Sequence, residues 1–334
     1  MSNKNTTILV TGATGFVGQH LCRYLLTKGY SIKAVGRKPS LEIMHPNLTY
    51  IRVEGLHEQT DWATLFQGVG IVVHLAGRAH QSKEQGMQHL ALYQQENVKT
   101  TQWLAKAAIQ YDVKRFIYLS TIKVIGEKTV NIALRAEDQP RPQDPYSVSK
   151  LQAEQILQEE SRRSGMEWVI IRPPLIYGSL VKGNFRKLLK LAKTKFPLPF
   201  GATSHRRSFV SITNLCSFIE CCMTHPYAQR EVFLVSDNHD LTCGELIGFL
   251  RKAMHRKTRI FPMPLSVLKL LGLLAGKRNE VNKMTDALQI NIEKSTRLLG
   301  WQVPYSVEDS FKALFEEERL PYNAGTSANK NQVT

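Results

Sequence analysis

Residues 8–20, Ile-Leu-Val-Thr-Gly-Ala-Thr-Gly-Phe-Val-Gly-Gln-His, decide the fold of this chain. The apolar run at 8–10 predicts a buried strand, and the three glycines, three residues apart, predict a turn that leads into a helix. Glycines let a backbone approach phosphate groups closely, and a helix N-terminus presents free N–H groups and the positive end of its dipole. The stretch therefore predicts a cradle for the pyrophosphate of a dinucleotide cofactor, and with it redox chemistry.

Two further elements follow in the order that this chemistry needs. Ser120 and Thr121 end an apolar strand at 116–119, and Tyr146 and Lys150 lie four residues apart on one face of a predicted helix. A free phenol has a pKa of about 10, which is too high for acid–base work at neutral pH. A nearby ammonium and the charge of an oxidised nicotinamide both favour the phenolate, so we expect them to lower the pKa of Tyr146.

The segments Thr11-Gly-Ala-Thr-Gly-Phe-Val-Gly18 and His74-Leu-Ala-Gly77 complete this pattern. Together they resemble the cofactor turn and the fourth-strand motif of the extended short-chain dehydrogenase/reductase family, a group of sugar-nucleotide epimerases, dehydratases and reductases. The resemblance runs from about Thr7 to Trp301. It implies that Tyr146 is the general acid/base and that the catalytic residues are Thr121, Tyr146 and Lys150.

The end of the second predicted strand, Gly36-Arg37-Lys38, bears on the choice of nicotinamide. NAD-binding chains usually carry an acid there that holds the ribose 2′-hydroxyl, whereas a guanidinium binds a 2′-phosphate. We therefore expect NADP(H) to be preferred, with NAD(H) as the alternative. The resemblance implies that the cofactor-binding residues are Gly12, Thr14, Gly15, Phe16, Val17, Gly18, Arg37, Lys38, Leu56, Leu75, Ala76, Gly77, Tyr146, Lys150 and Pro173.

Strand-like runs alternate with helical patterns through the first half of the chain. This alternation predicts an α/β fold, a Rossmann-type doubly wound parallel sheet with helices on both faces. We expect residues 1–173 to form the cofactor-binding domain and residues 174–321 to form mainly a smaller C-terminal α/β substrate-binding cap, built from interleaved segments. Residues 322–334 are polar and are predicted to be a disordered tail.

The composition of the 334-residue chain argues against a membrane-spanning protein and against a metal-binding protein. The longest apolar candidate, 265–275, is interrupted by polar residues and glycine. No run reaches the ~20 residues of a membrane span, so we expect an amphipathic helix there, with a membrane-surface role as the minor alternative. The cysteines and histidines show no metal-ligand spacing, so we predict no metal site and reduced thiols in a cytoplasmic protein.

The net charge of +16 favours anionic partners. The basic residues are spread along the chain without a nucleic-acid-binding motif, so we expect a phosphate-rich cofactor and substrate rather than nucleic acid. The resemblance implies a UDP-sugar held by Arg78, Thr121, Asn184, Arg207 and Arg278. It also implies a homodimer that pairs through residues 90–110 and 146–163.

The residues around Thr121, Tyr146 and Lys150 limit which reactions of the family this chain is expected to catalyse. Ile122-Lys123 stands where dehydratases of the family carry an Asp-Glu pair, which argues against elimination of water. Leu175 stands where UDP-glucose 4-epimerases commonly carry asparagine, which argues against a strict role on UDP-glucose and UDP-galactose. A 4-epimerase keeps NAD⁺ bound, whereas a 4-ketoreductase consumes exchangeable NADPH. Arg37 and Lys38 favour binding of NADPH, and therefore the reductase.

We therefore predict a 4-ketoreductase of a UDP-4-keto-6-deoxy-N-acetylhexosamine in the synthesis of a surface polysaccharide such as lipopolysaccharide O-antigen. A UDP-glucose or UDP-N-acetylglucosamine 4-epimerase is the first alternative. A non-catalytic NADP(H)-binding sensor is the second.

Overall fold

A computed structural model describes residues 6–79, 86–179, 184–274, 276, 281–282 and 285–316. Its main body is a seven-stranded sheet in which every neighbouring pair of strands is parallel. In spatial order the strands are β3 (Leu48–Arg52), β2 (Ile32–Gly36), β1 (Thr7–Thr11), β4 (Val69–His74), β5 (Arg115–Leu119), β6 (Glu167–Arg172) and β9 (Glu231–Leu234). The order of strands reverses between β1 and β4, and in such sheets a ligand crevice forms outside the carboxyl ends at this point.

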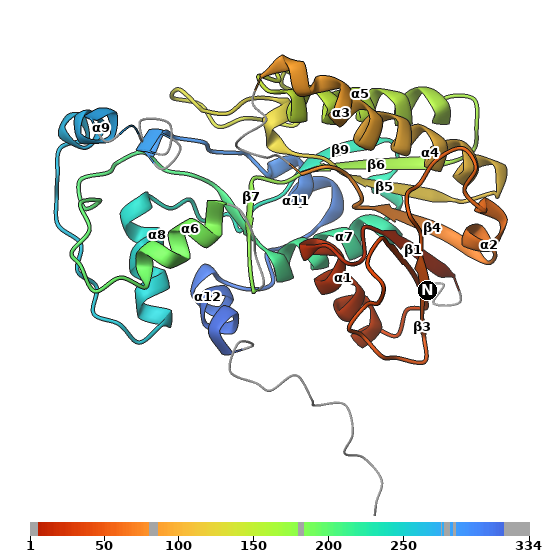
Figure 1. The fold of residues 1–334 in the computed structure, drawn as a ribbon, viewed down its shortest axis with the longest axis horizontal. Coiled ribbons are helices and arrows are strands. Elements are labelled where there is room, and N and C mark those ends of the chain that lie inside the picture. The colour runs from red at the N-terminus through yellow and green to blue at the C-terminus, as the bar shows by residue number, and fades with distance from the viewer. Residues whose placement is uncertain are drawn as a thin grey trace, which may run out of the picture.

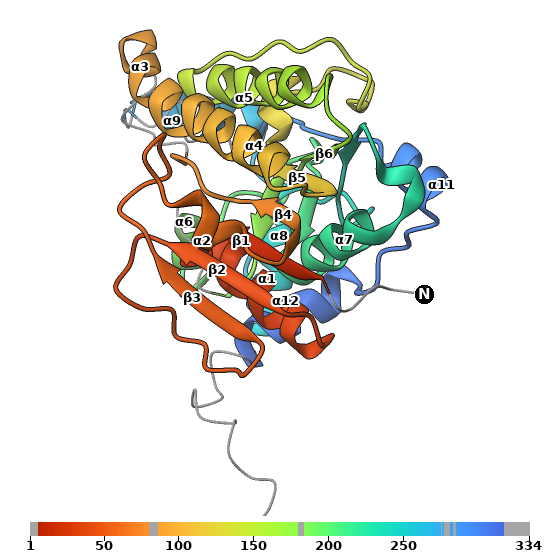
Figure 2. The same cartoon turned by 90° about the vertical axis from the view of Figure 1, so that its right-hand side faces the viewer.

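Helices cover both faces of the sheet (Figures 1 and 2). One face carries α1 (Phe16–Thr27) and α7 (Ile212–Thr224), and the other carries α2 (Trp62–Phe66), α4 (Thr100–Gln110) and α5 (Pro145–Ser161). Successive residues of β1 enter the two layers alternately, since Ile8 and Val10 pack with the α1 layer and Leu9 with the α4–α5 layer. A strand that is apolar on both faces belongs in the middle of a parallel sheet. The predicted doubly wound α/β fold is confirmed.

A smaller lobe lies beside the carboxyl ends of the strands (Figure 1). It contains β7 (Leu175–Tyr177), which pairs in parallel with β8 (Phe209–Ser211), and the helices α6 (Asn184–Ala192), α8 (Cys243–Ala253), α9 (Leu265–Leu274) and α12 (Val307–Glu316). Its core is aromatic, with the ring of Tyr177 stacked 4.6 Å from that of Phe311 and 5.7 Å from that of Phe185. Among the described residues, no helix is long and apolar enough to cross a membrane.

The chain does not stay in the smaller lobe after residue 173. β9 returns to the main sheet beside β6, and α11 (Glu293–Leu299) packs against β9. The predicted boundary between residues 173 and 174 stays a prediction, and the predicted tail at 322–334 lies outside the described residues. Short 3-10 turns lie at Met87–His89, Ile122–Val124 and Pro226–Ala228.

Two glycines of the first turn are required by its geometry. Gly12 has a φ of +68°, and a Cβ there would lie 2.7 Å from the backbone nitrogen of Ala76. A Cβ on Gly18 would collide with the carbonyl oxygen of Gly12 and lie 2.7 Å from the Cα of Ala13. Helix α1 can therefore approach the end of β1 only because Gly18 has no side chain.

In a Gly18→Ala variant we expect the free energy of unfolding to fall by about 1–3 kcal/mol, because the new methyl group must push α1 away from the turn. Urea denaturation measures this loss. Gly165→Ala is the matched control, since a Cβ at Gly165 meets nothing within 4 Å and stability should not fall. A Gly18→Ala protein as stable as the wild type would contradict this account of the turn.

Candidate active site

The glycine turn forms the floor of a cavity of about 360 Å³ at the switch point of the sheet. Helix α1 starts there with no side-chain cap and no acidic residue in its first turn, so its N-terminal dipole is not compensated. These features fit the pyrophosphate of a dinucleotide. The predicted cofactor residues that line the cavity are Gly12, Thr14, Gly15, Arg37, Leu56, Leu75, Ala76 and Gly77. The predicted residues Phe16, Val17, Gly18, Lys38, Tyr146, Lys150 and Pro173 do not line it.

The rest of the lining was not predicted. It includes Val35, Gly36, Val53, Gly55, His57, Gln95, Glu96, Thr100 and Trp103. Several of these come from the predicted helix 90–110, which the structure divides into α3 (Leu90–Tyr93), a π-helix at Gln94–Lys99 and α4. A π-turn changes which residues face inward and often marks a functional site. The apolar pattern of the sequence carries no signal for it.

Glu96 of the π-helix connects two predicted ligand-binding arginines. Its carboxylate lies 3.5 Å from Arg37 and 3.2 Å from Arg78. The Arg78 guanidinium also lies over the ring of Tyr93, 5.6 Å from its centroid. The acid that the end of β2 lacks is thus supplied from another element, and its charge would repel a 2′-phosphate placed beside Arg37.

Asn97 joins this cavity to the helix that carries the catalytic tyrosine. Its side-chain oxygen accepts a hydrogen bond of 2.7 Å from the backbone of Arg78, and its nitrogen donates one of 2.9 Å to the hydroxyl of Ser149. A Cβ on Gly77 would lie 2.8 Å from the same oxygen. The fourth-strand motif, the π-helix and α5 are therefore held together by one buried amide.

The three predicted catalytic residues come together at the ends of β5 and α5. Lys150 donates a hydrogen bond of 2.7 Å to the carbonyl oxygen of Leu119, and its ammonium lies 4.0 Å from the centroid of the Tyr118 ring. Thr121 lies just beyond β5 and forms a side-chain hydrogen bond with Tyr146. Tyr146 and Lys150 lie one helical turn apart on the inner face of α5.

Burial governs the acid–base properties of this set. It raises the pKa of Tyr146, the charge of Asp144 raises it further, and the hydrogen bond from Thr121 lowers it. Burial also lowers the pKa of Lys150 to about 7, against the opposing charge of Glu154. The expectation that Lys150 lowers the pKa of Tyr146 is therefore not met in the free protein, because an ammonium with a pKa near 7 is only partly charged at neutral pH.

A neutral histidine supports the same region from inside the sheet. Burial lowers the pKa of His74 to about 3, and the charge of Lys150 acts in the same direction. The ring nitrogens of His74 form hydrogen bonds of 2.7 Å with Thr11 and 3.0 Å with Thr101. The histidine of the fourth-strand motif thus ties β4 to β1 and α4.

A buried ion pair lies one further turn along α5. Glu154 binds Arg172 at the end of β6 through two contacts, of 2.6 and 3.1 Å. It also accepts a short hydrogen bond from Ser120, the residue before Thr121. Breaking such a buried pair costs about 3–5 kcal/mol, because the remaining charge is left without a partner. The pair fixes α5 against β5 and β6.

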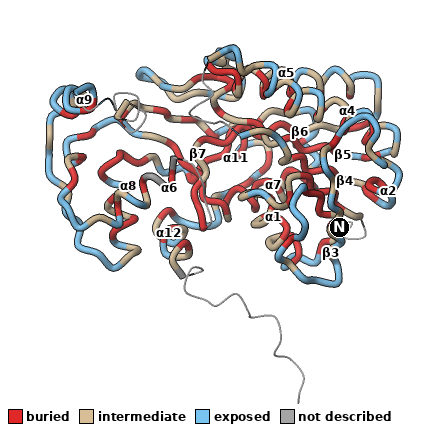
Figure 3. The backbone as a smooth tube through the Cα atoms, viewed as in Figure 1, coloured by how far each residue is buried: buried red, intermediate tan, exposed pale blue. Residues whose placement is uncertain are grey.

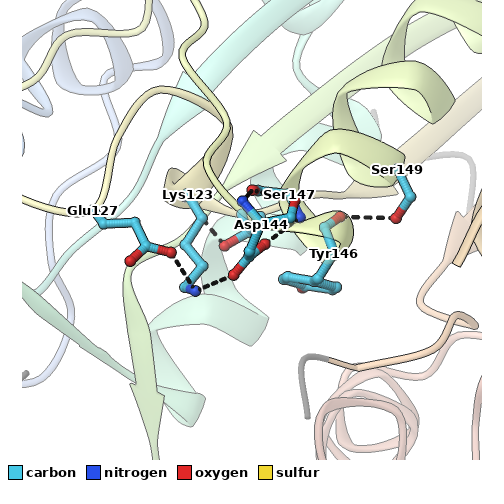
Figure 4. Close-up of polar contacts among 7 residues, drawn as sticks. Lys123, Glu127, Asp144, Tyr146, Ser147 and Ser149 are labelled. Carbon is cyan, nitrogen blue, oxygen red and sulfur yellow. Dashed lines mark hydrogen bonds and ion pairs between the residues drawn. The ribbon is translucent and has the colours of Figure 1, made fainter. Parts of the chain in front are cut away.

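A second charged group lies at the start of α5 (Figure 4). Asp144 caps the helix by accepting a hydrogen bond of 2.7 Å from the backbone of Ser147. Its other oxygen lies 2.6 Å from the ammonium of Lys123, which is also 2.6 Å from Glu127. The Lys123 charge compensates the carboxylate whose field raises the pKa of Tyr146.

The predicted substrate residues are only partly placed. Arg207 is half-buried, donates a hydrogen bond of 2.8 Å to the carbonyl oxygen of Asp286, and has Glu127 among the charges that face it. Burial lowers the pKa of Arg207. Asn184 begins α6, but its side chain and the whole of Arg278 lie outside the described residues. No group of three potential metal ligands occurs in the described part of the chain.

Comparisons with known proteins agree with this geometry. The sequence model described as "NAD dependent epimerase/dehydratase family" matches residues 8–236. A Vibrio cholerae protein named UDP-glucose 4-epimerase is 40% identical, covering 91% of this chain and 93% of that protein. An Escherichia coli O157:H7 protein named N-acetyl-alpha-D-glucosaminyl-diphospho-ditrans,octacis-undecaprenol 4-epimerase is 28% identical, over 94% of this chain and 96% of that one.

Solved structures share the fold. The UDP-N-acetylglucosamine 4-epimerase from Bacillus cereus superposes with a TM-score of 0.76 at 19% identity, covering 94% of this chain and 99% of that one. The UDP-glucuronic acid 4-epimerase from Bacillus cereus, solved in complex with NAD, superposes with a TM-score of 0.74 at 24% identity, covering 93% and 98%.

Lys150 is expected to make the stability of the fold depend on pH. Its pKa is lowered to about 7 in the folded chain, against about 10.4 for an exposed lysine, so between these values the unfolded chain binds more protons. The contribution of this group to the free energy of unfolding therefore rises with pH over that window, by on the order of 5 kcal/mol in total.

Urea unfolding of the wild type and of Lys150→Met at pH 7 and pH 9 measures this effect. We expect the wild type to gain stability relative to the variant as the pH rises. The buried thiols and phenols also titrate over this pH range in the unfolded chain. Their contribution to the free energy of unfolding is the same in both proteins, so it cancels when the two profiles are subtracted. Lys106→Met, at an exposed lysine, should show no such divergence. Parallel profiles for the wild type and Lys150→Met would contradict the lowered pKa.

Proposed function

The chain belongs to the NAD dependent epimerase/dehydratase family, and we propose that this protein inverts the configuration at C4 of a UDP-linked sugar with bound NAD(H). The proposal rests on the assembly of Thr121, Tyr146 and Lys150 beside a dinucleotide cavity. The 40% identity to a protein named UDP-glucose 4-epimerase supports the reaction at C4. This choice reverses the order of the two enzymatic predictions made from the sequence.

The chain's own residues supply the proton chemistry. The cavity lined by Gly12, Gly15 and Arg37 would hold NAD(H), which would supply a hydride acceptor and donor for the sugar carbon. Tyr146 takes the proton of the C4 hydroxyl as that carbon is oxidised, and returns it when the carbon is reduced from the opposite face. Thr121 holds the same oxygen, and its hydrogen bond to Tyr146 favours the phenolate that the first step needs. A positive nicotinamide ring bound beside Tyr146 would lower the pKa of the phenol, which burial has raised.

The elements around Thr121 argue against loss of water. Ile122 is buried, and the ammonium of Lys123 is engaged by Glu127 and Asp144. No carboxylate occupies either position, so the acid–base pair of a dehydratase is missing there. The assembled catalytic set likewise disfavours the non-catalytic sensor, which has no need of it.

A 4-ketoreductase that uses NADPH is the second candidate. It is favoured by the end of β2, which carries Gly36 and the exposed Arg37 and Lys38 instead of an acid. The side chain of Arg37 is 68% exposed, so it can reorient onto a 2′-phosphate. Against this stands Glu96, whose carboxylate is 3.5 Å from Arg37. We therefore propose NAD(H) as the preferred cofactor, and NADP(H) only if the protein is a 4-ketoreductase.

The UDP-sugar, the surface-polysaccharide role and the homodimer belong to the same proposal. Arg207 is suited to the substrate diphosphate because a guanidinium binds such oxygens in a bidentate manner. For pairing, the predicted helices carry a shallow groove of about 670 Å³ on their outer side, lined by residues such as Gln94, Gln152 and Arg162.

We expect the purified protein to release NAD⁺ or NADH on denaturation and to interconvert C4 epimers of UDP-glucose or UDP-N-acetylglucosamine, as followed by chromatography. Tyr146→Phe should lower the rate by about 10²–10⁴, because the proton acceptor is lost. Tyr111→Phe, at a tyrosine stacked on Phe66 away from the cavity, should leave it unchanged. A protein that arrives empty, prefers NADPH and only reduces 4-keto UDP-sugars would favour the second candidate.

Lys123 is expected to set the pH dependence of this reaction. In Lys123→Met the Asp144 carboxylate loses its cation, so the pKa of Tyr146 rises and the acid limb of the kcat/KM profile moves up by about one pH unit. Asp144→Asn keeps the helix cap, since asparagine caps as well as aspartate, and should move the limb down. The double variant should return close to the wild-type profile. Unchanged acid limbs in the two single variants, or limbs that move in the same direction in both, would contradict this electrostatic account.

A further inference from the structure

The helix α9 presents an apolar stripe to the outside of the molecule. Val267, Leu270, Leu271 and Leu274 recur at the spacing of one helix face and are 42%, 55%, 48% and 76% exposed. Leu273 is also 52% exposed. The opposite face, with Leu268 and Gly272, is the one that is buried. Figure 3 shows the helix at the far end of the smaller lobe, largely in the colour of exposed residues.

Such a face is unusual for a helix on a globular protein, which turns its apolar stripe toward the core. The helix is attached by its other side, where Leu268 packs in a small cluster with Leu198 and Ile247 and Leu265 packs against that cluster. Single exposed leucines need no explanation, but a contiguous stripe marks an interaction surface. The stripe is therefore available for a partner.

Two loops beside α9 add positive charge. The loop after α6 carries Lys193 and Lys195, and the loop that leads into α9 carries Arg256, Lys257 and Arg259, all exposed. The sequence has no aspartate or glutamate between residues 184 and 200 or between 246 and 274. None of the five cations forms an ion pair with another described residue. Three acids of the lobe are engaged by other cations, in the pairs Arg206–Glu245, Lys252–Glu308 and Lys269–Asp286.

The two loops run side by side. The backbone of Leu198 donates to Arg259 and accepts from Phe261, with distances of 2.9 and 3.0 Å. The buried Arg251 fixes both loops by donating to the carbonyl oxygens of Arg259 and Phe196. Phe196 is 75% exposed and Phe261 is 40% exposed. Figure 1 places both loops and α9 along one end of the molecule, which we call the α9 end.

We propose that the α9 end docks on the surface of an anionic lipid bilayer, with α9 lying in the interface and its leucine stripe in the acyl boundary. Exposed leucine and phenylalanine fringed by lysine and arginine is the composition that binds anionic membrane surfaces. A second copy of the chain fits less well, because a two-fold contact would bring five cations against the same five. Nucleic acid would attract the cations but leave the leucine stripe in water.

The α9 end is connected to the proposed substrate site. Lys269 of α9 lies 3.4 Å from the carboxylate of Asp286, and Arg207 donates to the carbonyl oxygen of the same residue. If the function proposed above holds, docking would place the entrance for the substrate diphosphate close to the bilayer.

Sedimentation with vesicles tests the docking surface. We expect the full chain to bind vesicles of phosphatidylcholine with phosphatidylglycerol at least about tenfold more strongly than vesicles of phosphatidylcholine alone, and the binding to weaken with salt. Leu270→Glu combined with Leu274→Glu should reduce binding by about tenfold or more, since charges at these positions oppose insertion. Ile132→Glu is the matched control, at an isoleucine that is 72% exposed in another part of the chain.

Three other results would overturn the docking proposal. The proposal is overturned if the wild type does not bind the anionic vesicles, or if binding survives the double leucine variant. It is also overturned if that variant converts a dimer to a monomer in solution while vesicle binding is absent, since a second copy then covers α9. C4 interconversion of a soluble UDP-sugar should be unchanged in the double variant. Vesicle binding without any such activity would retain the docking surface and reject the proposed function.

Discussion

The buried ion pair between Glu154 and Arg172 is the constraint on which the catalytic geometry depends. It joins α5 to β6, and the hydrogen bond from Ser120 to Glu154 adds the end of β5. Because α5 repeats its inner face every turn, fixing Glu154 also fixes Lys150 and Tyr146 on the same line. Thr121, next to Ser120, then meets Tyr146 without any loop having to adjust. The acid–base set is thus positioned by the packing of three rigid elements.

The charged residues around Tyr146 and the cofactor cavity are paired with residues of opposite charge. Burial raises the pKa of Tyr146 and lowers that of Lys150, so the free protein holds its proton on the phenol. Asp144 caps α5, and its charge raises the pKa of Tyr146. The ammonium of Lys123 lies beside that carboxylate and opposes this effect. On the cofactor side, Glu96 compensates Arg37 and Arg78. Each arrangement keeps a charge near the site while limiting its field at the reacting group.

The two lobes divide the tasks of the molecule. The sheet and the π-helix build the dinucleotide cavity, whereas the smaller lobe carries Arg207 and the α9 end. Part of the +16 net charge lies in two stretches of the smaller lobe, 184–200 and 246–274, which contain cations and no acids. A single hydrogen-bonded residue, Asp286, lies between the predicted substrate arginine and the docking helix.

The sequence by itself determined the elements whose chemistry is local. The glycine turn, the one-turn spacing of Tyr146 and Lys150 and the buried first strand follow from short-range pattern, since each depends on backbone freedom or helical period alone. Tertiary structure decided what depends on distant partners. The pairing of strand β9, the contacts of Glu96 with Arg37 and Arg78, the pairs Glu154–Arg172 and Lys123–Asp144, and the pKa directions all depend on residues far apart in the chain. Burial and charge act through space, so only the folded chain sets them.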